Sequence, residues 1–304
     1  MAELGRLLTA MVTPFTPTGE VDYARAKALA LALLDSGSDG VVVCGTTGES
    51  PTVTSDEKIK LFQVIKSAIG RRGSVVANTG TNDTARSIEL SKKAEAIGVD
   101  ALLLVVPYYN KPSQEGLYRH FSAIAKSTPL PCILYNVPSR TITDLKAETV
   151  LRLAEVPNII GIKEASGNIE QITGIINGTK GRNFRVWSGN DADTFAIMER
   201  GGYGVVAVAS HLVGKQIKQM IELCVKGDFA KAKAIHEYLA QLNKDLFVVA
   251  NPIPVKYALN QVGFPVGGYR LPLCEPDAAS AAIITATVKR YTIDLPVPAG
   301  ARGR

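Results

Sequence analysis

The sequence lacks the features that mark several classes of protein. No apolar run approaches the roughly 20 residues that a membrane helix needs, and the first six residues do not open a basic segment followed by a long apolar one, as a secretory signal would. The 4 cysteines never occur as C-x-x-C, and the 3 histidines show no metal-ligand spacing. We therefore expect no membrane span, no metal site and no disulfide framework, and we expect reduced thiols in a cytoplasmic protein.

The sequence also lacks clustered charge. Lys and Arg number 34 against 28 Asp and Glu, which gives a net charge of +6, but no run of five basic residues occurs. Basic side chains are not interleaved with aromatic ones, so we expect no nucleic-acid binding. A dispersed positive charge modestly favours small anionic substrates instead. With 304 residues and 46% hydrophobic side chains, the chain can bury a large core.

Short apolar runs alternate with amphipathic stretches along most of the chain. The runs are rich in Val, Ile and Leu without polar alternation, which is typical of parallel strands buried on both faces. A capping box of Thr54 and Glu57 marks the start of one helix. We expect strands at residues 7–13, 40–44, 74–78, 101–106, 132–136, 159–163, 185–188 and 204–208, and helices at 22–36, 55–69, 83–97, 114–126, 146–154, 169–177 and 192–200.

This alternation, repeated about eight times in roughly 210 residues, predicts an α/β fold, a closed (β/α)8 TIM barrel. The alternative is a doubly wound open sheet, but its G-x-G-x-x-G fingerprint is missing after the first strand. Helical patterns continue at 212–225, 229–243 and 278–290, and two prolines in the segment 251–254 interrupt them. We expect a barrel over residues 1–210, a C-terminal helical domain over 211–294 and a flexible tail over 295–304.

In such barrels, chemistry is carried at the C-terminal ends of the strands, and Lys163 is the sharpest feature there. Desolvation disfavours an ammonium ion, so a lysine that emerges from an apolar strand can offer a free amine to a carbonyl group. From the position alone, two other readings stay open. The lysine could pair with a neighbouring carboxylate, or its side chain could extend to solvent.

Other strand ends carry polar groups that fit the same chemistry. The turn at residues 45–48 can hold a carboxylate with hydroxyl and backbone N–H groups, although an ordinary tight turn has the same composition. The phenol groups of Tyr135 and Tyr109 either take part in the chemistry or only pack against their neighbours. The Arg140 guanidinium either binds a carboxylate through two N–H groups or is a solvated charge. Glu49 is a candidate general base or a carboxylate that stabilises the turn. No metal cluster or nucleotide loop accompanies these residues, so we expect no cofactor.

Longer motifs carry a resemblance to a known family. They are GTTGES at 45–50, PYYN at 107–110, LYNVPSRT at 134–141, GIKEA at 161–165 and NPIPVK at 251–256. Their order and spacing resemble those of the dihydrodipicolinate synthase family, within the wider group of class I pyruvate lyases related to N-acetylneuraminate lyase. The resemblance runs from about residue 7 to residue 290, nearly the whole chain.

This resemblance implies a barrel with a C-terminal helical domain, assembled as a homotetramer from two tight dimers. It implies that Lys163 forms a Schiff base with pyruvate, whose carboxylate lies on the turn of Thr46 and Thr47. The enamine then adds to L-aspartate 4-semialdehyde. Cyclisation gives a hydroxy-tetrahydrodipicolinate, the first committed step toward diaminopimelate and lysine.

The same resemblance implies further roles. Tyr135 is the general acid and base, connected through Thr46 to Tyr109 of a neighbouring subunit. Arg140 binds the carboxylate of the aldehyde, which favours this substrate over a sugar acid. The implied catalytic residues are thus Lys163, Tyr135, Thr46 and Tyr109, and the implied substrate-binding residues are Thr47, Arg140, Gly189 and Val206.

A regulatory lysine site is implied at the interface of the tight dimer. Inhibited bacterial relatives commonly carry histidines at the positions of Ser55 and Lys58 and a glutamate at the position of Arg86. Here a cation replaces the carboxylate that would bind the ligand's ammonium group, so we expect weak or absent inhibition by lysine. The implied residues are Ser50, Pro51, Ser55, Lys58, Asn82, Arg86 and Tyr108.

Two alternative functions stay open. One is another pyruvate-dependent lyase of the same group, such as a 2-keto-sugar-acid lyase or an oxo-acid aldolase. The other is a non-catalytic barrel used for binding, which fold alone would not exclude. The second is the weaker alternative because Lys163, Tyr135, Tyr109 and Thr46 are all present.

Overall fold

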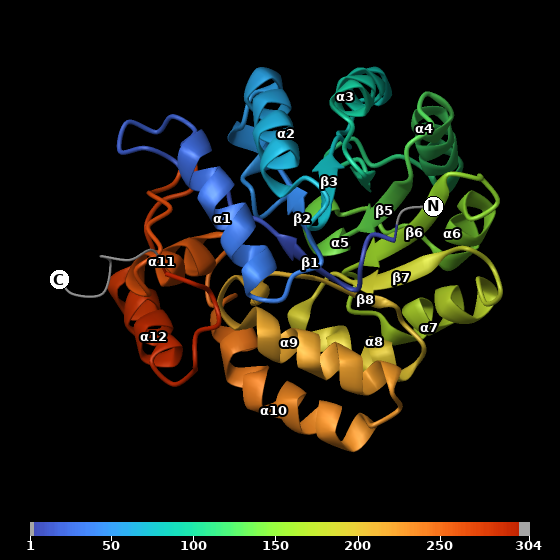
Figure 1. Ribbon diagram of the computed structural model, residues 1–304. Coiled ribbons are helices and arrows are strands. Elements are labelled where there is room, and N and C mark those ends of the chain that lie inside the picture. The colour runs from blue at the N-terminus through green and yellow to red at the C-terminus, as the bar shows by residue number, and fades with distance from the viewer. Residues whose placement is uncertain (1–2, 298–304) are drawn as a thin grey trace.

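Eight parallel strands close into a barrel in sequence order, and β1 pairs with both β2 and β8 (Figure 1). The structure is a computed structural model, and it describes residues 3–297. The expected (β/α)8 barrel is confirmed. The strands are β1 Leu7–Ala10, β2 Gly40–Val43, β3 Ser74–Asn78, β4 Ala101–Val105, β5 Cys132–Asn136, β6 Ile159–Glu164, β7 Arg185–Ser188 and β8 Gly204–Ala207.

The strands are buried on both faces, as their unbroken apolar runs predict. One hydrophobic cluster fills the barrel interior and includes Leu8, Val42, Ile133 and Trp187, while a larger one lies between strands and helices. Most strands end within one residue of the expected position. β1 is shorter because the chain leaves the ladder after Ala10, and a buried histidine takes over as acceptor for a backbone N–H beyond it.

Helices surround the barrel between successive strands (Figure 1). The capping box at the start of α2 is present, with the Thr54 side chain accepting from the Glu57 N–H and the Glu57 carboxylate accepting from the Thr54 N–H. The short helix α5 and the turn η1 were not expected from the sequence, while η2 overlaps the start of the helix expected at 192–200. The helices up to β8 are α1 Tyr23–Asp35, α2 Ser55–Ile69, α3 Thr84–Ile97, α4 Gln114–Lys126, α5 Pro138–Thr141, α6 Ala147–Leu153, α7 Ile169–Gly178 and α8 Thr194–Glu199, with 3₁₀ turns η1 Ser50–Thr52 and η2 Asp191–Asp193.

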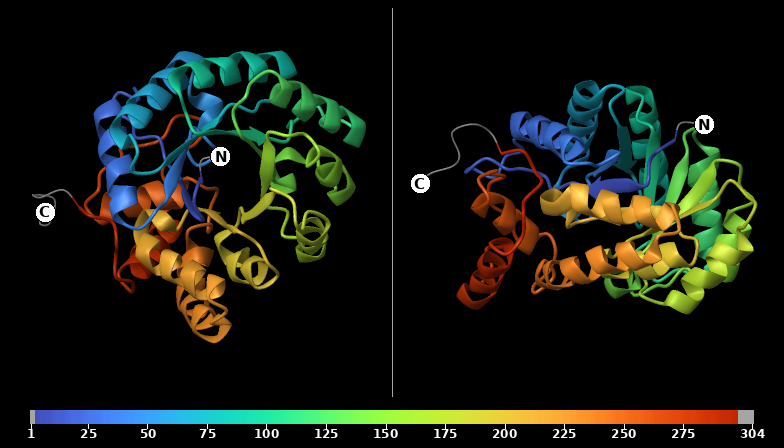
Figure 2. Two further views of the ribbon diagram at one scale, coloured as in Figure 1. Left: turned by 45° about the vertical axis from the view of Figure 1, so that its right-hand side comes forward. Right: turned by 60° about the horizontal axis from the view of Figure 1, so that its bottom comes forward.

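Up to residue 297, four further helices follow β8: α9 Ser210–Val225, α10 Phe229–Asp245, α11 Ile253–Gln261 and α12 Ala278–Val288. α9 packs against β1 and α1 on one side and against α10 on the other, and α11 packs on α12 (Figure 2). α11 was missed because its prolines read as an interruption. Proline is tolerated in the first turn of a helix, where its missing N–H has no helical partner anyway.

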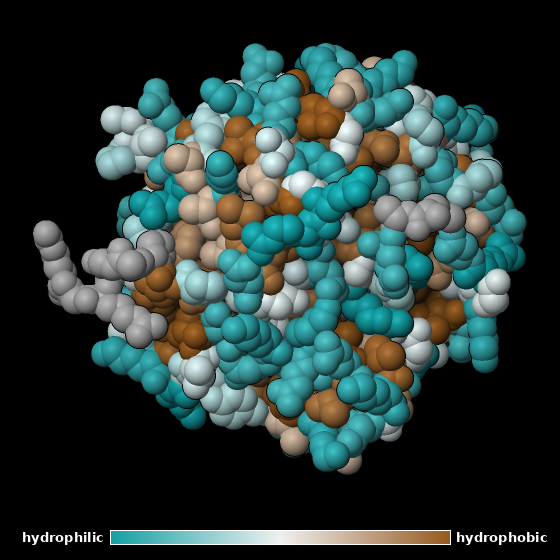
Figure 3. Space-filling view, in the orientation of Figure 1, coloured by the Kyte–Doolittle hydropathy of each residue, from teal (hydrophilic) through white to brown (hydrophobic). Residues whose placement is uncertain are grey.

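The division at residues 210 and 211 stays a prediction, and it falls at the start of α9. Of the expected tail, Leu295 is 3% exposed and belongs to the core, whereas residues 298–304 lie outside the described part of the chain. Hydrophilic side chains predominate over α9 and α10 on the face drawn in Figure 3, and hydrophobic ones gather over α12. No helix within residues 3–297 is both long and apolar enough to cross a membrane.

Candidate active site

Lys163 lies on β6, in register with Tyr135 on β5 and Trp187 on β7. The Nζ atom of Lys163 is 4.1 Å from the centre of the Tyr135 ring, and both residues are 5% exposed. Among residues 3–297, no carboxylate pairs with this Nζ atom and no acceptor binds it. The two ordinary explanations of Lys163, an ion pair and extension to solvent, therefore do not describe its surroundings.

Asp191 lies close enough to Lys163 for their charges to interact. Burial raises the pKa of the Asp191 carboxyl to about 6, and the nearby positive charge of Lys163 opposes part of that rise. Its Oδ2 atom accepts hydrogen bonds from the N–H of Val208 at 3.0 Å and of Ala209 at 3.1 Å. Asp191 thus holds the turn that follows β8. Its place after a strand end was visible in the sequence, but nothing there indicated this role.

The expected carboxylate-binding turn follows β2 and begins at Cys44, whose φ of 57° is left-handed. Gly48 and Glu49 donate backbone hydrogen bonds to Gly45 and Thr46 and close the turn. In the described part of the chain, the backbone N–H groups of Thr46 and Thr47 have no acceptor. Free N–H groups at a tight turn attract an anion.

Residues near the C-terminal helices hold this turn in place. Lys256 donates to Glu49 at 2.6 Å in an ion pair whose side chains are 0% and 1% exposed, and the Arg270 N–H binds the other Glu49 oxygen. Asn251 donates from Nδ2 to the Thr47 hydroxyl at 3.0 Å. Because its carboxylate is occupied, Glu49 is a turn-stabilising residue and not a free base.

The predicted substrate-binding residues come from four different loops and strands. Arg140 lies in α5 and donates from Nη2 to the backbone carbonyl of Asn251 at 3.1 Å. Val206 is buried within β8. Gly189 follows β7, where a Cβ atom would meet the Cβ of Ala165 at 2.7 Å, so only glycine fits this approach of neighbouring strands.

Tyr109 does not lie with the other predicted catalytic residues within this chain. It is 91% exposed and has a left-handed φ of 73°. The loop is braced by Asn82, which donates to the Tyr108 carbonyl at 3.2 Å and accepts from Asn110 at 2.8 Å. The structure brings Lys163 and Tyr135 together but leaves Tyr109 at the surface.

Two buried titratable groups near the site are structural. Glu164 is bound by the Ser166 N–H at 2.8 Å and by the Asn136 amide, and burial raises the pKa of its carboxyl to about 7. His211 accepts from the Val12 N–H at Nε2, so Nδ1 donates to the Val208 carbonyl. Burial lowers the pKa of His211 to about 4, which keeps it neutral.

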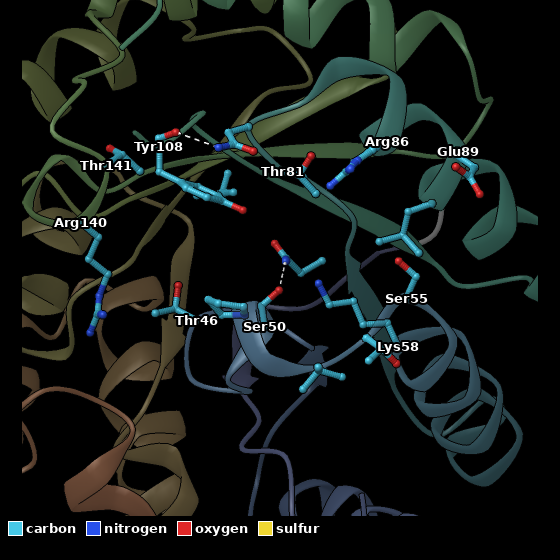
Figure 4. A pocket seen from close by; sticks show the side chains of 18 of the residues that line it. Thr46, Ser50, Ser55, Lys58, Thr81, Arg86, Glu89, Tyr108, Arg140 and Thr141 are labelled. Carbon is cyan, nitrogen blue, oxygen red and sulfur yellow. Dashed lines mark hydrogen bonds between the residues drawn. The ribbon is translucent and has the colours of Figure 1, made fainter. Parts of the chain in front are cut away.

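A cavity of about 580 Å³ opens beside the turn of Thr46. Figure 4 shows Thr46 and Arg140 on one side of it and Lys58 and Arg86 on the other. The cavity brings together every residue expected at the regulatory site. Its lining includes Ser50, Pro51, Ser55, Lys58, Asn82, Arg86 and Tyr108, together with Thr46 and Arg140.

The fold and the site define a (β/α)8-barrel protein with a buried lysine that has no ion-pair partner in residues 3–297, and with a turn after β2 whose backbone N–H groups are free. A model of the dihydrodipicolinate synthetase family matches residues 3–290, and the chain belongs to that family. The family expected from the motifs is confirmed.

Individual relatives are similar over nearly their whole length. The chain is 62% identical to 4-hydroxy-tetrahydrodipicolinate synthase of Dehalococcoides mccartyi, over 98% of this chain and 100% of the relative. Dihydrodipicolinate synthase of Bacillus anthracis is 46% identical, with a TM-score of 0.93 over 96% of this chain and 99% of that structure. The enzyme of Cyanidioschyzon merolae with lysine bound is 47% identical, with a TM-score of 0.92 over 94% and 97%.

Proposed function

We propose that the chain is a lyase that condenses pyruvate with L-aspartate 4-semialdehyde to give 4-hydroxy-tetrahydrodipicolinate, the first committed step toward diaminopimelate and lysine. Relatives that are 50–62% identical carry the name of this enzyme. The observation that carries the proposal is the buried Lys163 amine, which has no carboxylate partner in residues 3–297 and lies 4.1 Å from the Tyr135 ring.

The reaction begins at Lys163. Its amine nitrogen adds to the C2 carbonyl of pyruvate, and the carbonyl oxygen leaves as water with the two amine protons. The imine nitrogen then takes up one further proton, which gives the protonated imine. The cationic imine withdraws electrons, so a methyl proton can leave and an enamine forms. Tyr135 is the group placed to move protons on and off these intermediates. The Asp191 carboxyl, which interacts electrostatically with Lys163, is the acidic group that would balance this positive charge.

The turn after β2 binds the pyruvate carboxylate. The free N–H groups of Thr46 and Thr47 supply donors in this proposal, and Gly189 and Val206 line the pocket. Since Asn251 donates to the Thr47 oxygen, the hydroxyl proton of Thr47 is left to point at the substrate. The second substrate brings a carboxylate of its own, for which Arg140 is the cation at the cavity wall.

We propose that the chain works as a homotetramer of two tight dimers. The support is Tyr109, which is 91% exposed and separated from Lys163 and Tyr135 in a single chain. A neighbouring copy would place its Tyr109 beside Thr46 and complete the proton relay. The four cysteines are all free, which suits the reducing cytoplasm that we propose as the compartment.

We also propose that lysine inhibits weakly or not at all. The cavity wall carries Lys58 and Arg86, and their charges repel the ammonium groups of lysine. Initial rates measured against increasing lysine will show this. An inhibition constant below 1 mM would contradict it (about −4 kcal/mol of binding).

Borohydride trapping tests the proposed chemistry. The protein is incubated with pyruvate, reduced, digested and analysed by mass spectrometry. We expect one adduct of reduced pyruvate, on the peptide that contains Lys163, and none in a Lys163→Arg variant. The variant keeps the positive charge but cannot form the imine. An adduct on another lysine, or none in the unaltered protein, would overturn the proposal.

A further inference from the structure

The cavity beside the turn of Thr46 has an uneven charge distribution. Its lining contains four cations and one carboxylate, Glu89, and that carboxylate already pairs with Lys93 at 2.6 Å. Arg140 is engaged with a backbone carbonyl on the opposite side. Two cations, Lys58 and Arg86, therefore line the hollow without an ion pair in residues 3–297. Hydrogen bonding to Lys93, and to a smaller extent the charge of Arg86, lowers the pKa of the Glu89 carboxyl.

Lys58 is the less usual of the two. It lies on α2 and is only 9% exposed, and its ammonium group forms no hydrogen bond or ion pair within residues 3–297. Burial lowers the pKa of Lys58, since desolvation disfavours its charge. The neighbouring group that favours the charge is the Cys44 thiol, and burial raises the pKa of that thiol to about 12. A buried cation with no anion beside it is an unfavourable arrangement that a bound anion would relieve.

Arg86 approaches the same hollow from α3. Its backbone N–H caps the helix through Asp83, but its guanidinium binds no partner in the described chain. Figure 4 shows the ends of the Lys58 and Arg86 side chains directed into the hollow, which Ser50 and Thr81 also line. The Ser50 oxygen accepts from the Asn78 amide at 3.3 Å, so its hydroxyl hydrogen is free to donate.

We propose that Lys58 and Arg86, together with the Ser50 hydroxyl, form a binding site for a small anion with two negative charges, a phosphate or a short dicarboxylate. The guanidinium of Arg86 binds two oxygens of one anionic group in its planar fork. The Lys58 ammonium is a compact charge that binds the second group or a third oxygen. The site is separate from the carboxylate-binding turn, because Thr46 and Arg140 lie across the hollow.

Isothermal titration calorimetry tests this site without any substrate, so its outcome does not depend on the proposed reaction. Inorganic phosphate and succinate are titrated separately into the full-length protein, and the one that binds more tightly identifies the class of anion. We expect one site per chain. The affinity should fall about tenfold or more in Lys58→Met and in Arg86→Met, each of which removes one charge-assisted contact.

Controls separate this site from other sources of binding. Lys92→Met removes the same charge from an exposed position on α3 and should leave the affinity unchanged. Arg140→Ala should also leave it unchanged. If Arg140→Ala alone abolishes binding, the anion binds near Arg140 and not between Lys58 and Arg86, which would overturn the proposal.

Two further results would also overturn the proposal. One is the absence of saturable binding of either anion. The other is a change in subunit assembly in Lys58→Met or Arg86→Met, measured by sedimentation, with no anion binding in the unaltered protein. That result would mean that these cations pair with a second copy of the chain.

Discussion

Two regions of the molecule each contain a buried lysine. One is the mouth of the barrel, at the C-terminal ends of the strands, and the other is the junction between the barrel and the C-terminal helices. The two lysines differ in their partners. Lys256 at the junction is 0% exposed, pairs with Glu49 at 2.6 Å and donates to the Thr13 carbonyl at 3.1 Å. Lys163 at the mouth is 5% exposed and has an aromatic ring beside it, but no carboxylate within bonding distance in residues 3–297. Burial alone does not mark a reactive lysine. The feature that distinguishes Lys163 from Lys256 is the absence of an ion-pair partner within residues 3–297.

The polar groups around the two lysines differ in the same way, in whether they have hydrogen-bond partners. At the junction, both oxygens of Glu49 are bound, and Arg270 forms a two-pronged pair with Glu57. At the mouth, the N–H groups of Thr46 and Thr47 have no acceptor within the described chain. Satisfied polar groups stabilise a fold, and unsatisfied ones are available to a ligand. Variants of the two regions should therefore lose different properties.

The largest expected effect is that of Lys163→Met. Turnover should fall by about 10⁴-fold or more, as for other residues that form the covalent intermediate. Stability should change little, since the Lys163 amine forms no ion pair or hydrogen bond within residues 3–297 that the variant would break. Steady-state kinetics and urea unfolding measure the two properties. If turnover of Lys163→Met stays within tenfold of that of the unaltered enzyme, Lys163 is not the reactive lysine and does not differ from Lys256 in function.

Lys256→Met should show the reverse pattern. It leaves the Glu49 carboxylate buried without its partner, which costs about 3–5 kcal/mol of unfolding free energy. The double variant Lys256→Met with Glu49→Gln removes both charges and should recover much of that loss. Urea unfolding of the two variants provides the measurement. A loss below about 1 kcal/mol in the single variant would show that the junction is not held by this pair.

Much of the fold was predictable from the sequence because a parallel barrel has a simple pattern. Its strands are buried on both faces, so each appears as an unbroken apolar run, as at residues 101–105 and 132–136. Local chemistry also located the start of α2. α11 was missed because of the two prolines at its start. Proline interrupts the interior of a helix but is accepted in its first turn, and the sequence alone does not show which case applies.

The site was predictable only in part. Lys163 and the turn of Thr46 follow strands, so topology alone places them at one end of the barrel. The pairing of Glu49 with Lys256 joins residues 207 positions apart, and no local pattern reveals it. Asn251 and Asp191 act through contacts with Thr47 and with the turn after β8, which also form only in the folded chain. Residue types were visible, and their partners were not.

Arg140→Ala tests the substrate-binding role proposed for this cation at the mouth of the barrel. The guanidinium is bound only to the Asn251 carbonyl in residues 3–297, so stability should change little. The KM for L-aspartate 4-semialdehyde should rise about 10–100-fold through loss of one charge-assisted contact, while that for pyruvate changes far less. Arg140→Lys, which keeps the charge without the fork, should lie between the two. Equal increases for both substrates would remove Arg140 from its role.

The smallest effect concerns the partly exposed pair of Glu57 and Arg270 at the junction, whose side chains are 22% and 19% exposed. Hydrogen bonding to Arg270 lowers the pKa of the Glu57 carboxyl from 4.5 to about 2. A carboxyl whose pKa is lower in the folded state stabilises the fold above pH 4.5. This contribution is lost as the pH falls from 4.5 toward 2.

Glu57→Gln should therefore cost about 1–2 kcal/mol of unfolding free energy at pH 7, with allowance for solvent screening of the pair. The difference between the variant and the unaltered protein should shrink as the pH is lowered from 5 toward 3, because the unaltered protein then loses the same interaction (~1.4 kcal/mol per pKa unit). Urea unfolding at several pH values measures it. Activity per folded molecule should stay unchanged, since Glu57 contacts the junction and not the mouth. A difference that is constant with pH would mean that the ionised carboxylate contributes nothing, and that the junction depends on the buried Lys256 pair alone.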